Sequence, residues 1–317
     1  MNEENAIVMK NVVKEFKVLN RHEGLAGSLK DLFSRDYRTV KAVDNISIKI
    51  KAGEIVGYLG PNGAGKSTTI KMMTGVLEPS RGQIIVNGNI PYKNRTKNAE
   101  NIGVVFGQRS QLWWSLPLIE SFKLLKEIYM IPTEDYNKML ELYRELADID
   151  NLLHKPVRQM SLGQRTLSDI LAAFLHNPKI VFLDEPTIGL DVSMKARIRN
   201  LIKGLNKEKN TTVILTTHDM GDVDALCQRI VIIDHGSMVY DNDIEHLKRY
   251  FGSYRTVRLN MEGIGWKEIL VDESKNNVMS VISEYQSRGN IKDIKIEDIS
   301  TEEVIKKIYE NAASKTA

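Results

Sequence analysis

Cysteine, proline and long apolar runs are scarce in this sequence. Its single cysteine, Cys227, cannot form an internal disulfide and is too little for a zinc cluster. No stretch approaches the ~18 consecutive apolar residues of a membrane-spanning helix, and the acidic start MNEENAIVMK lacks the apolar core of a secretion signal. With 8 prolines and 21 glycines among 317 residues, collagen-like and disordered classes are excluded. We therefore expect a globular protein of the reducing cytosol, without a transmembrane helix or a secretion signal.

An excess of charge of one sign is also absent. The chain has 44 Lys and Arg against 41 Asp and Glu, which gives a net charge of +3. This balance predicts no nucleic-acid partner, because binding to phosphate backbones needs a strongly basic surface. The length of 317 residues exceeds one average domain, so we expect two domains or one large domain with an appendage.

A glycine-rich segment follows a short apolar stretch. Residues 54–59 (EIVGYL) predict a buried strand, which runs directly into GPNGAGKST and then into a helical pattern. Glycines let backbone N–H groups surround a polyphosphate, and the N-terminus of the next helix adds its positive dipole end. The segment predicts a nucleoside triphosphate site built from Gly60, Pro61, Asn62, Gly63, Ala64, Gly65, Lys66, Ser67 and Thr68.

The side chains of this segment and of a second apolar strand suit ATP and Mg²⁺ as cofactors. Lys66 would bridge the β- and γ-phosphates, and the Ser67 hydroxyl would complete a magnesium shell. The stretch KIVFLD predicts a strand that ends in Asp184, a second magnesium ligand. Glu185 follows at the strand end, where a carboxylate can orient and deprotonate an attacking water. A helix-capping or salt-bridge role for Glu185 is the alternative.

Four further motifs accompany the phosphate loop: FGQ (106–108), SLGQR (161–165), FLDEPTIGLD (182–191) and TTHD (216–219). In this order and spacing the sequence resembles the ATP-binding-cassette (ABC) ATPases over roughly residues 7–236. The resemblance implies an α/β ABC ATPase fold, which is a RecA-like phosphate-loop core with an antiparallel β subdomain and an α-helical subdomain.

The resemblance also implies a head-to-tail dimer, a homodimer or a heterodimer, with two ATP molecules between the protomers. Residues of the signature segment and the D-loop would reach the nucleotide of the partner: Ser161, Gly163, Gln164 and Asp191. Ser161 and Gly163 would cap its γ-phosphate. One departure is Leu162, which stands where the family has glycine. A leucine with positive φ would be strained there. We expect ordinary helix-start dihedrals, because the resemblance includes exporter-type relatives with a bulky residue at this position.

Two more site residues follow from the resemblance. Gln108 would sense magnesium and the attacking water, and it would link the site to the helical subdomain. His218 would contact the γ-phosphate as the switch histidine. Its position after the predicted strand TVILTT supports this, since α/β folds place ligand contacts at the carboxyl ends of strands.

The aromatic residue that stacks on adenine has two candidates. Phe16 fits by its local sequence, because it follows the first strand pattern NVVKE. Tyr37 fits by its spacing to the phosphate loop, and it stands just before the second predicted strand. We favour Tyr37, because a loop inserted after Phe16 would leave Tyr37 next to the strand that pairs with the first one.

The expected domain organisation has two parts. Residues 1–242 form the ABC ATPase domain, with an inserted amphipathic segment at 17–38 and a helical subdomain at 109–165. Residues 243–317 form a small α+β domain with the order strand, strand, helix, strand, helix. Within it, Ser300 and Glu303 have the spacing of a capping box. No cluster of catalytic groups is visible in this second part.

Two features favour a transporter subunit over other ABC ATPases. Trp113 and Trp114 stand at a loop-to-helix junction, and paired aromatics of this kind are typical of interfaces. The segment 17–38 has an apolar helical face flanked by basic residues, which suits a membrane interface or a permease. Core tryptophans and a helix packed on the sheet are the alternatives. We predict the ATPase subunit of an exporter at the cytoplasmic face of the cell membrane, bound to separate permease subunits; a soluble ATPase of a cytosolic assembly or regulatory complex is the alternative.

Overall fold

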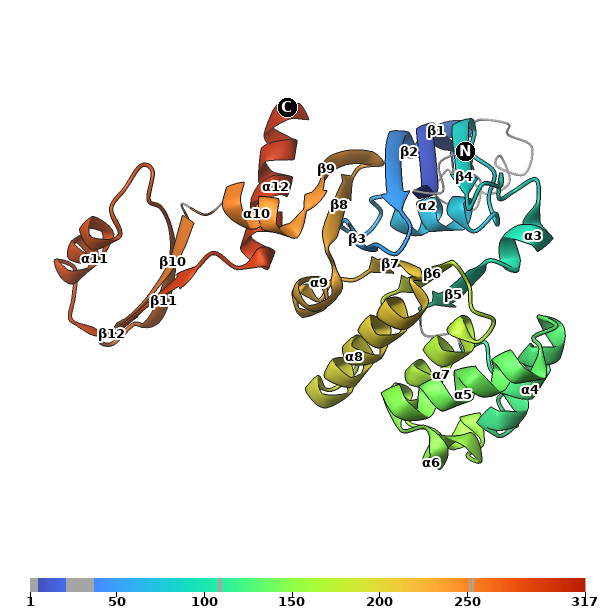
Figure 1. The fold of residues 1–317 in the computed structure, drawn as a ribbon. Helices are drawn as coiled ribbons and strands as arrows, with labels where there is room; N and C mark the ends of the chain where they lie inside the picture. Colours follow the sequence, from blue (N-terminus) through green and yellow to red (C-terminus); the bar gives the residue numbers. More distant parts are fainter. Residues whose placement is uncertain (1–4, 21–36, 108–109, 251, 253, 317) are drawn as a thin grey trace, which may run out of the picture. The chain divides into compact units, whose positions relative to one another are not determined.

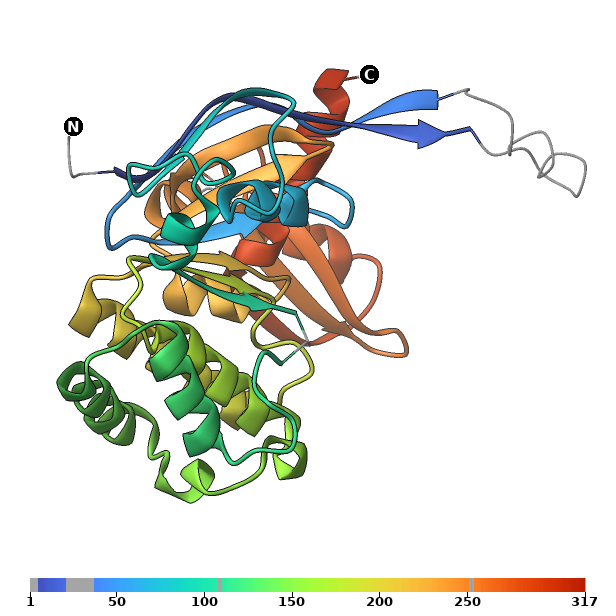
Figure 2. The ribbon, with the colours of Figure 1, turned by 90° about the vertical axis from the view of Figure 1, so that its right-hand side faces the viewer.

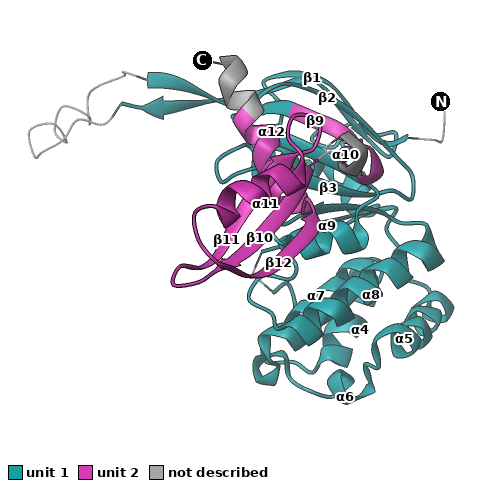
Figure 3. Cartoon of the chain, turned by 90° about the vertical axis from the view of Figure 1, so that its left-hand side faces the viewer, with its two compact units in different colours: residues 1–238 teal, residues 239–317 magenta. Residues whose placement is uncertain are grey.

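The computed structural model describes residues 5–20, 37–107, 110–250, 252 and 254–316. The chain divides into two compact units, Met1–Met238 and Val239–Ala317, which are coloured separately in Figure 3. This division falls a few residues before the boundary at 242/243 that the sequence suggested.

The first unit is built on a sheet with the strand order β5-β6-β7-β3-β8-β9, whose last strand, β9, begins at the end of this unit. The pairs β5–β6, β6–β7, β7–β3 and β3–β8 are parallel. Their near-continuous apolar sequences are typical of strands buried on both faces. The strands are β3 (Ile55–Leu59), β5 (Ile102–Phe106), β6 (Ile180–Asp184), β7 (Thr212–Thr216), β8 (Arg229–Asp234) and β9 (Ser237–Asp243).

A second, antiparallel sheet has the order β2-β1-β4, from β1 (Asn5–Leu19), β2 (Tyr37–Lys51) and β4 (Arg81–Val86). One buried cluster joins it to the parallel sheet and to helix α2 (Lys66–Met73). The short helix α3 (Arg95–Ala99) precedes β5 (Figure 1). This sheet is the antiparallel subdomain that the sequence predicted.

The hairpin of β1 and β2 is long, as Figure 2 shows. Its two strands pair as far as Leu19 opposite Tyr37. Both ends of the expected insertion at 17–38 therefore belong to paired strands. The expected amphipathic helix, in residues 24–38, falls mostly at 24–36, outside the described residues, whereas its last two residues, Tyr37 and Arg38, belong to β2.

Helices form a layer below the strands β5 and β6 in Figure 1. They are α4 (Leu118–Ile128), α5 (Thr133–Ala147), α6 (Asp150–Leu153), a 3-10 turn (Val157–Gln159) and α7 (Leu162–Phe174). The expected apolar face of α5 is buried and that of α4 is buried in its first half, with Phe122 of α4 and Tyr143 of α5 fully enclosed. Two more helices, α8 (Val192–Lys209) and α9 (Met220–Leu226), complete the unit.

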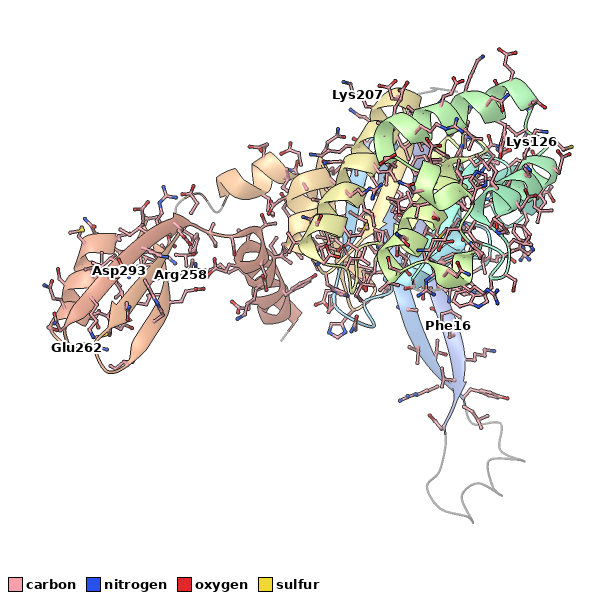
Figure 4. All side chains as sticks on the ribbon, turned by 90° about the horizontal axis from the view of Figure 1, so that it is seen from below. Phe16, Lys126, Lys207, Arg258, Glu262 and Asp293 are labelled. Carbon is pink, nitrogen blue, oxygen red and sulfur yellow. The ribbon has the colours of Figure 1, made fainter. Side chains whose placement is uncertain are left out.

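The second unit has a three-stranded antiparallel sheet with the order β11-β10-β12. Its elements are α10 (Ile244–Tyr250), β10 (Tyr254–Met261), β11 (Gly265–Asp272), α11 (Val278–Gln286), β12 (Ile291–Asp298) and α12 (Thr301–Thr316). The expected order of strands and helices is found. Arg258, labelled in Figure 4, forms ion pairs with Glu268 (2.7 Å) and Glu297 (3.1 Å) across the strands.

Two sequence predictions on local structure are confirmed. The capping box at the start of α12 is present, since Glu303 N donates to Ser300 Oγ (3.2 Å) and Ser300 N donates to Glu303 Oε2 (3.1 Å). Cys227 is buried, and burial raises the pKa of its thiol. Among the described residues, no helix has both the length and the hydropathy that crossing a bilayer requires.

Candidate nucleotide-binding site

A cavity of about 350 Å³ lies where the loop after β3 meets the carboxyl ends of β5 and β6. The phosphate loop contributes Pro61, Asn62, Gly63, Ala64, Gly65, Lys66, Ser67 and Thr68 to its lining. The remaining lining residues come from three other segments, and they are Ala42, Gly107, Asp184, Glu185 and Ile188. The structure therefore brings the two predicted halves of the site together.

The backbone of the loop explains its glycines. Gly63 (φ 82°) and Gly65 (φ 102°) adopt left-handed conformations that side chains disfavour. A Cβ on Gly65 would lie 2.2 Å from the carbonyl oxygen of Ala42, so the loop packs against β2 only without a side chain there. Gly65 also caps helix α2, whose N-terminus consequently opens onto the cavity.

Lys66 begins helix α2, and its side chain turns back over the loop. Its Nζ donates to the carbonyl oxygens of Gly60 (2.5 Å) and Pro61 (3.1 Å). Burial lowers the pKa of Lys66, while the carboxylates of Glu185 and Asp184 act in the opposite direction. The cation therefore lies between the phosphate loop and the two carboxylates, where an anionic ligand completes its neutralisation.

The two carboxylates stand at the end of β6, beside β7. Asp184 pairs in register with Thr216, whose Oγ1 donates to Asp184 Oδ1. Glu185 has φ 52°, a left-handed conformation that is uncommon for a residue with a side chain. Its backbone N–H donates to Thr216 O (2.9 Å), which helps to hold this conformation. Backbone strain of this kind gathers at active sites.

His218 and Glu185 are brought together although they stand far apart in the sequence. His218 Nε2 lies 3.0 Å from Glu185 Oε1. The His218 side chain is about half exposed, at 48%, and it follows the end of β7 as the sequence suggested. A carboxylate and an imidazole at this distance can share a proton.

The signature residues lie outside the cavity of the single chain. Ser161 and Gln164 form a capping box at the start of α7, with Gln164 N donating to Ser161 Oγ (3.2 Å). Leu162 opens the helix and does not have positive φ, as expected. Gly163 packs against Met194 of α8, because a Cβ there would lie 2.5 Å from Met194 Cγ. Asp191 caps α8 by accepting from Met194 N (2.9 Å).

Gln108 lies outside the described residues, but the chain just after it is described. Asp169 of α7 accepts hydrogen bonds from Ser110 Oγ (3.0 Å) and Gln111 N (3.1 Å). Its carboxyl group is largely buried, and burial raises its pKa to about 6. This carboxyl group therefore connects the segment after Gln108 to α7, the helix that begins at the signature residues.

The structure separates the two candidates for adenine stacking. Phe16, labelled in Figure 4, pairs with Val40 of β2, two residues from Ala42 in the cavity lining. Tyr37 pairs with Leu19 at the far end of the hairpin. Tyr37 stands five positions before Ala42, which is about 16 Å along a strand. The register thus places Phe16 nearer to Ala42 than Tyr37 along the hairpin, and which of the two aromatic rings stacks on adenine stays a prediction.

Sequence reasoning missed several residues of the site. Ala42 and Ile188 line the cavity without carrying polar side chains, so they give no chemical signal. Thr216 donates a hydrogen bond to Asp184. Its position at a strand end, directly before Thr217 and His218, is the sequence feature that could have identified it.

A magnesium ion fits the donor set. Ser67 offers an exposed hydroxyl and Asp184 a carboxylate, both on the cavity. Oxygen donors suit Mg²⁺, which commonly takes only one or two protein ligands and fills its shell with phosphate oxygens and water. Clusters of three or more His, Cys, Asp or Glu side chains, which would indicate a different kind of metal centre, are not found in the described part of the chain.

Comparisons with known proteins agree with this geometry. The family model described as ABC transporter matches residues 43–188. The chain is 32% identical over 228 residues to the ABC transporter ATP-binding protein NatA of Bacillus subtilis, covering 72% of this chain and 91% of that protein. It is 33% identical over 224 residues to the bacitracin transport ATP-binding protein BcrA of Bacillus licheniformis, covering 71% and 72%. Longer relatives such as ABC transporter A family member 1 of Dictyostelium discoideum match over 26% of their length.

Solved structures show the same fold. The dimeric post-hydrolysis structure of the ATP-binding cassette MJ0796 with ADP and Pi has a TM-score of 0.60 and 27% identity, covering 75% of this chain and 98% of that one. The protein cbiO1 of Clostridium perfringens, part of the ABC transporter complex cbiONQ, has a TM-score of 0.63 and 26% identity, covering 78% and 91%.

The fold and the site define an ABC-type ATPase. More specifically, the chain belongs to the ATP-binding proteins of ABC transporters, and its activity is the binding and hydrolysis of ATP in support of transport.

Proposed function

We propose that the chain is the ATPase subunit of an exporter and works as a dimer on the cytoplasmic side of the membrane, beneath separately encoded permease subunits. The observation that carries this proposal is an exposed aromatic pair directly after the segment that leaves the nucleotide site. Trp113 and Trp114 have 38% and 53% of their surface exposed. Core residues of a small helical subdomain would not be so exposed.

The segment that carries the pair is held in place. Leu112, just before it, is buried. The Trp113 carbonyl accepts from Leu116 N (3.1 Å), and the Trp114 carbonyl accepts from Arg158 N (2.9 Å). The guanidinium of Arg165, in the signature segment, lies 5.2 Å from the Trp114 ring centre. A rigid aromatic surface linked to the signature helix suits a partner that must respond to ATP.

Export is the direction we propose because of the likeness to LnrL of Bacillus subtilis, whose name refers to linearmycin resistance, and to BcrA, whose name refers to bacitracin transport. MetN of Geobacillus kaustophilus, a relative that is 33% identical, is named for methionine import, so similarity alone does not fix the direction. The transported substrate would be selected by the permease, so it does not follow from this chain.

At the ATP site we assign roles by position. The phosphate loop holds the triphosphate, Ser67 and Asp184 hold magnesium together with Gln108, and Phe16 in place of Tyr37 carries the adenine. Magnesium, when bound, neutralises charge on the β- and γ-phosphates.

The chain's own groups carry out the remaining chemistry. Glu185 accepts the proton of the attacking water, and His218 holds the Glu185 carboxylate at 3.0 Å while it faces the γ-phosphate. Ser161, Gly163, Gln164 and Asp191 serve the partner's nucleotide, since they lie outside the cavity of their own chain.

The test replaces Trp113 and Trp114 together with alanine. Each aromatic anchor at an interface contributes about 2 kcal/mol to the binding free energy. The double variant should therefore no longer bind membranes prepared from the cells in which the protein naturally occurs, which contain the permease. Thermal stability and ATP binding should stay close to those of the unchanged chain, because both rings are already exposed. Trp266→Ala, at a ring of the second unit that is 51% exposed, is the matched control and should leave membrane binding intact.

Three outcomes would refute the proposal. A stable double variant that still binds membranes would show that the pair is no docking surface. A chain found only in a cytosolic complex would support the alternative of a soluble ATPase. Early melting of the double variant would indicate core tryptophans, because core cavities of this size cost about 3 to 5 kcal/mol each.

A further inference from the structure

A fully buried carboxylate joins the two segments that carry the proposed catalytic pair. Asp222, in the first turn of α9, has no exposed surface. Its Oδ2 accepts from Thr187 Oγ1 and from Thr217 Oγ1 (3.0 Å). Its Oδ1 accepts from Arg199 Nε of α8 (2.6 Å). Burying a carboxylate without hydrogen-bond partners costs free energy. The three contacts therefore act together to keep the Asp222 carboxylate buried.

Each of the two threonines stands close to one catalytic residue in the chain. Thr187 follows Glu185 by two positions, with only the buried Pro186 between them. Thr217 directly precedes His218, and its hydroxyl also accepts from Asp219 N (3.0 Å). The Thr217 hydroxyl therefore links the residue before His218 to the residue after it.

The charge of Asp222 sets the direction of these bonds. An ionised carboxylate only accepts hydrogen bonds, so both threonine hydroxyls donate to the same oxygen. One acceptor atom thus holds the segment after Glu185 and the segment before His218 at a common point. Glu185 itself has a left-handed backbone (φ 52°), which persists only where the surroundings hold it.

We infer that Asp222 is a positioning residue for ATP hydrolysis, which sets the 3.0 Å contact between His218 Nε2 and Glu185 Oε1 through the hydroxyls of Thr187 and Thr217. This inference rests on the roles proposed above for Glu185 and His218. It predicts that losing either hydroxyl impairs the chemical step more than it impairs nucleotide binding, because the phosphate loop is not part of this network.

The experiment compares Thr→Val with Thr→Ser at positions 187 and 217 of the full chain. Valine keeps the shape of threonine without the hydroxyl, whereas serine keeps the hydroxyl. Each valine variant should lose roughly 10- to 100-fold in kcat, the scale expected for a small displacement of catalytic groups. Binding of a fluorescent ATP analogue should change less than about threefold, and each serine variant should recover most of the lost kcat.

Thr211 provides a matched control. It is buried, and its Oγ1 donates to the Pro178 carbonyl (3.1 Å) just before β7, away from the catalytic end of that strand. Thr211→Val should lower the melting temperature about as much as the other valine changes and leave kcat unchanged. Where a valine variant fails to fold, the alanine variant at the same position is measured with the same expectation.

A second comparison separates positioning from folding. In a His218→Ala background, Thr217→Val should cause little additional loss of kcat, because the residue that it positions is gone. Full additional loss there, wild-type kcat in the valine variants, or equal loss in valine and serine variants would each overturn the inference. A normal rate for Glu185→Gln would instead refute the proposed base, and this result does not depend on the threonines.

Discussion

Two groups near the end of the signature helix, the buried Asp169 of α7 and the partly buried His176 just after it, should give the protein opposite pH dependences that cancel in the native sequence. Burial raises the pKa of Asp169 from 3.8 to about 6, against hydrogen bonds from Ser110 and Gln111 and the charge of Arg165. Between these two values the folded chain binds more protons than the unfolded chain. The free energy of unfolding therefore falls as the pH rises through this range, by about 3 kcal/mol in all.

His176 works in the other direction. Burial lowers its pKa from 6.5 to about 4, although its Nε2 hydrogen bond to the Ile102 carbonyl (3.0 Å) opposes the shift. Its ring stacks on Tyr129 at 3.9 Å between centres. Here the unfolded chain binds more protons between pH 4 and 6.5, so stability rises with pH by about 3 kcal/mol. The two contributions overlap between pH 4 and 6 and largely offset each other.

The two groups are separated by substitution. Asp169→Asn removes the titration of Asp169 and leaves that of His176, so the free energy of unfolding of this variant should rise by about 2 kcal/mol more than that of the unchanged chain between pH 4.5 and 6.5. His176→Gln keeps a donor for the Ile102 carbonyl and should lose stability over the same interval. Denaturant unfolding at both pH values measures the differences. Parallel pH curves for all three chains would refute the reasoning.

Two further predictions concern the ATP site. Glu185→Gln keeps the size of the side chain but removes the base, so turnover should fall roughly 10²-fold or more while ATP binding survives, and steady-state hydrolysis with a binding assay checks both; a near-normal rate would mean that Glu185 is not the base. Phe16→Ala should weaken ATP binding by about 1 to 3 kcal/mol, the worth of one stacked base, whereas Tyr37→Ala should not, and the reverse result would restore Tyr37.

Local patterns determined most of the secondary structure. The apolar stretches before the phosphate loop and before Asp184 are strands, as predicted, because a strand buried on both faces needs a continuous apolar sequence. The capping box of Ser300 and Glu303 was also predictable, since a cap depends on residues three positions apart.

The limits of local patterns are clear at the adenine candidates. Spacing to the phosphate loop favoured Tyr37, but strand register placed Phe16 nearer the cavity. Register depends on which hydrogen bonds two strands exchange, and here it also includes bulges between Met9 and Lys14. Counting residues along the chain cannot supply this information.

The sequence by itself therefore determined the chemistry: a phosphate loop, the carboxylates of Asp184 and Glu185, and a histidine after a strand, in the order of one family. Only the tertiary structure decided how these groups meet. His218 reaches Glu185 at 3.0 Å, and Asp222 joins Thr187 to Thr217, because parallel strands bring their carboxyl ends to one edge of the sheet. Motifs record which groups are present, whereas the contacts between distant segments follow from packing, which no single segment encodes.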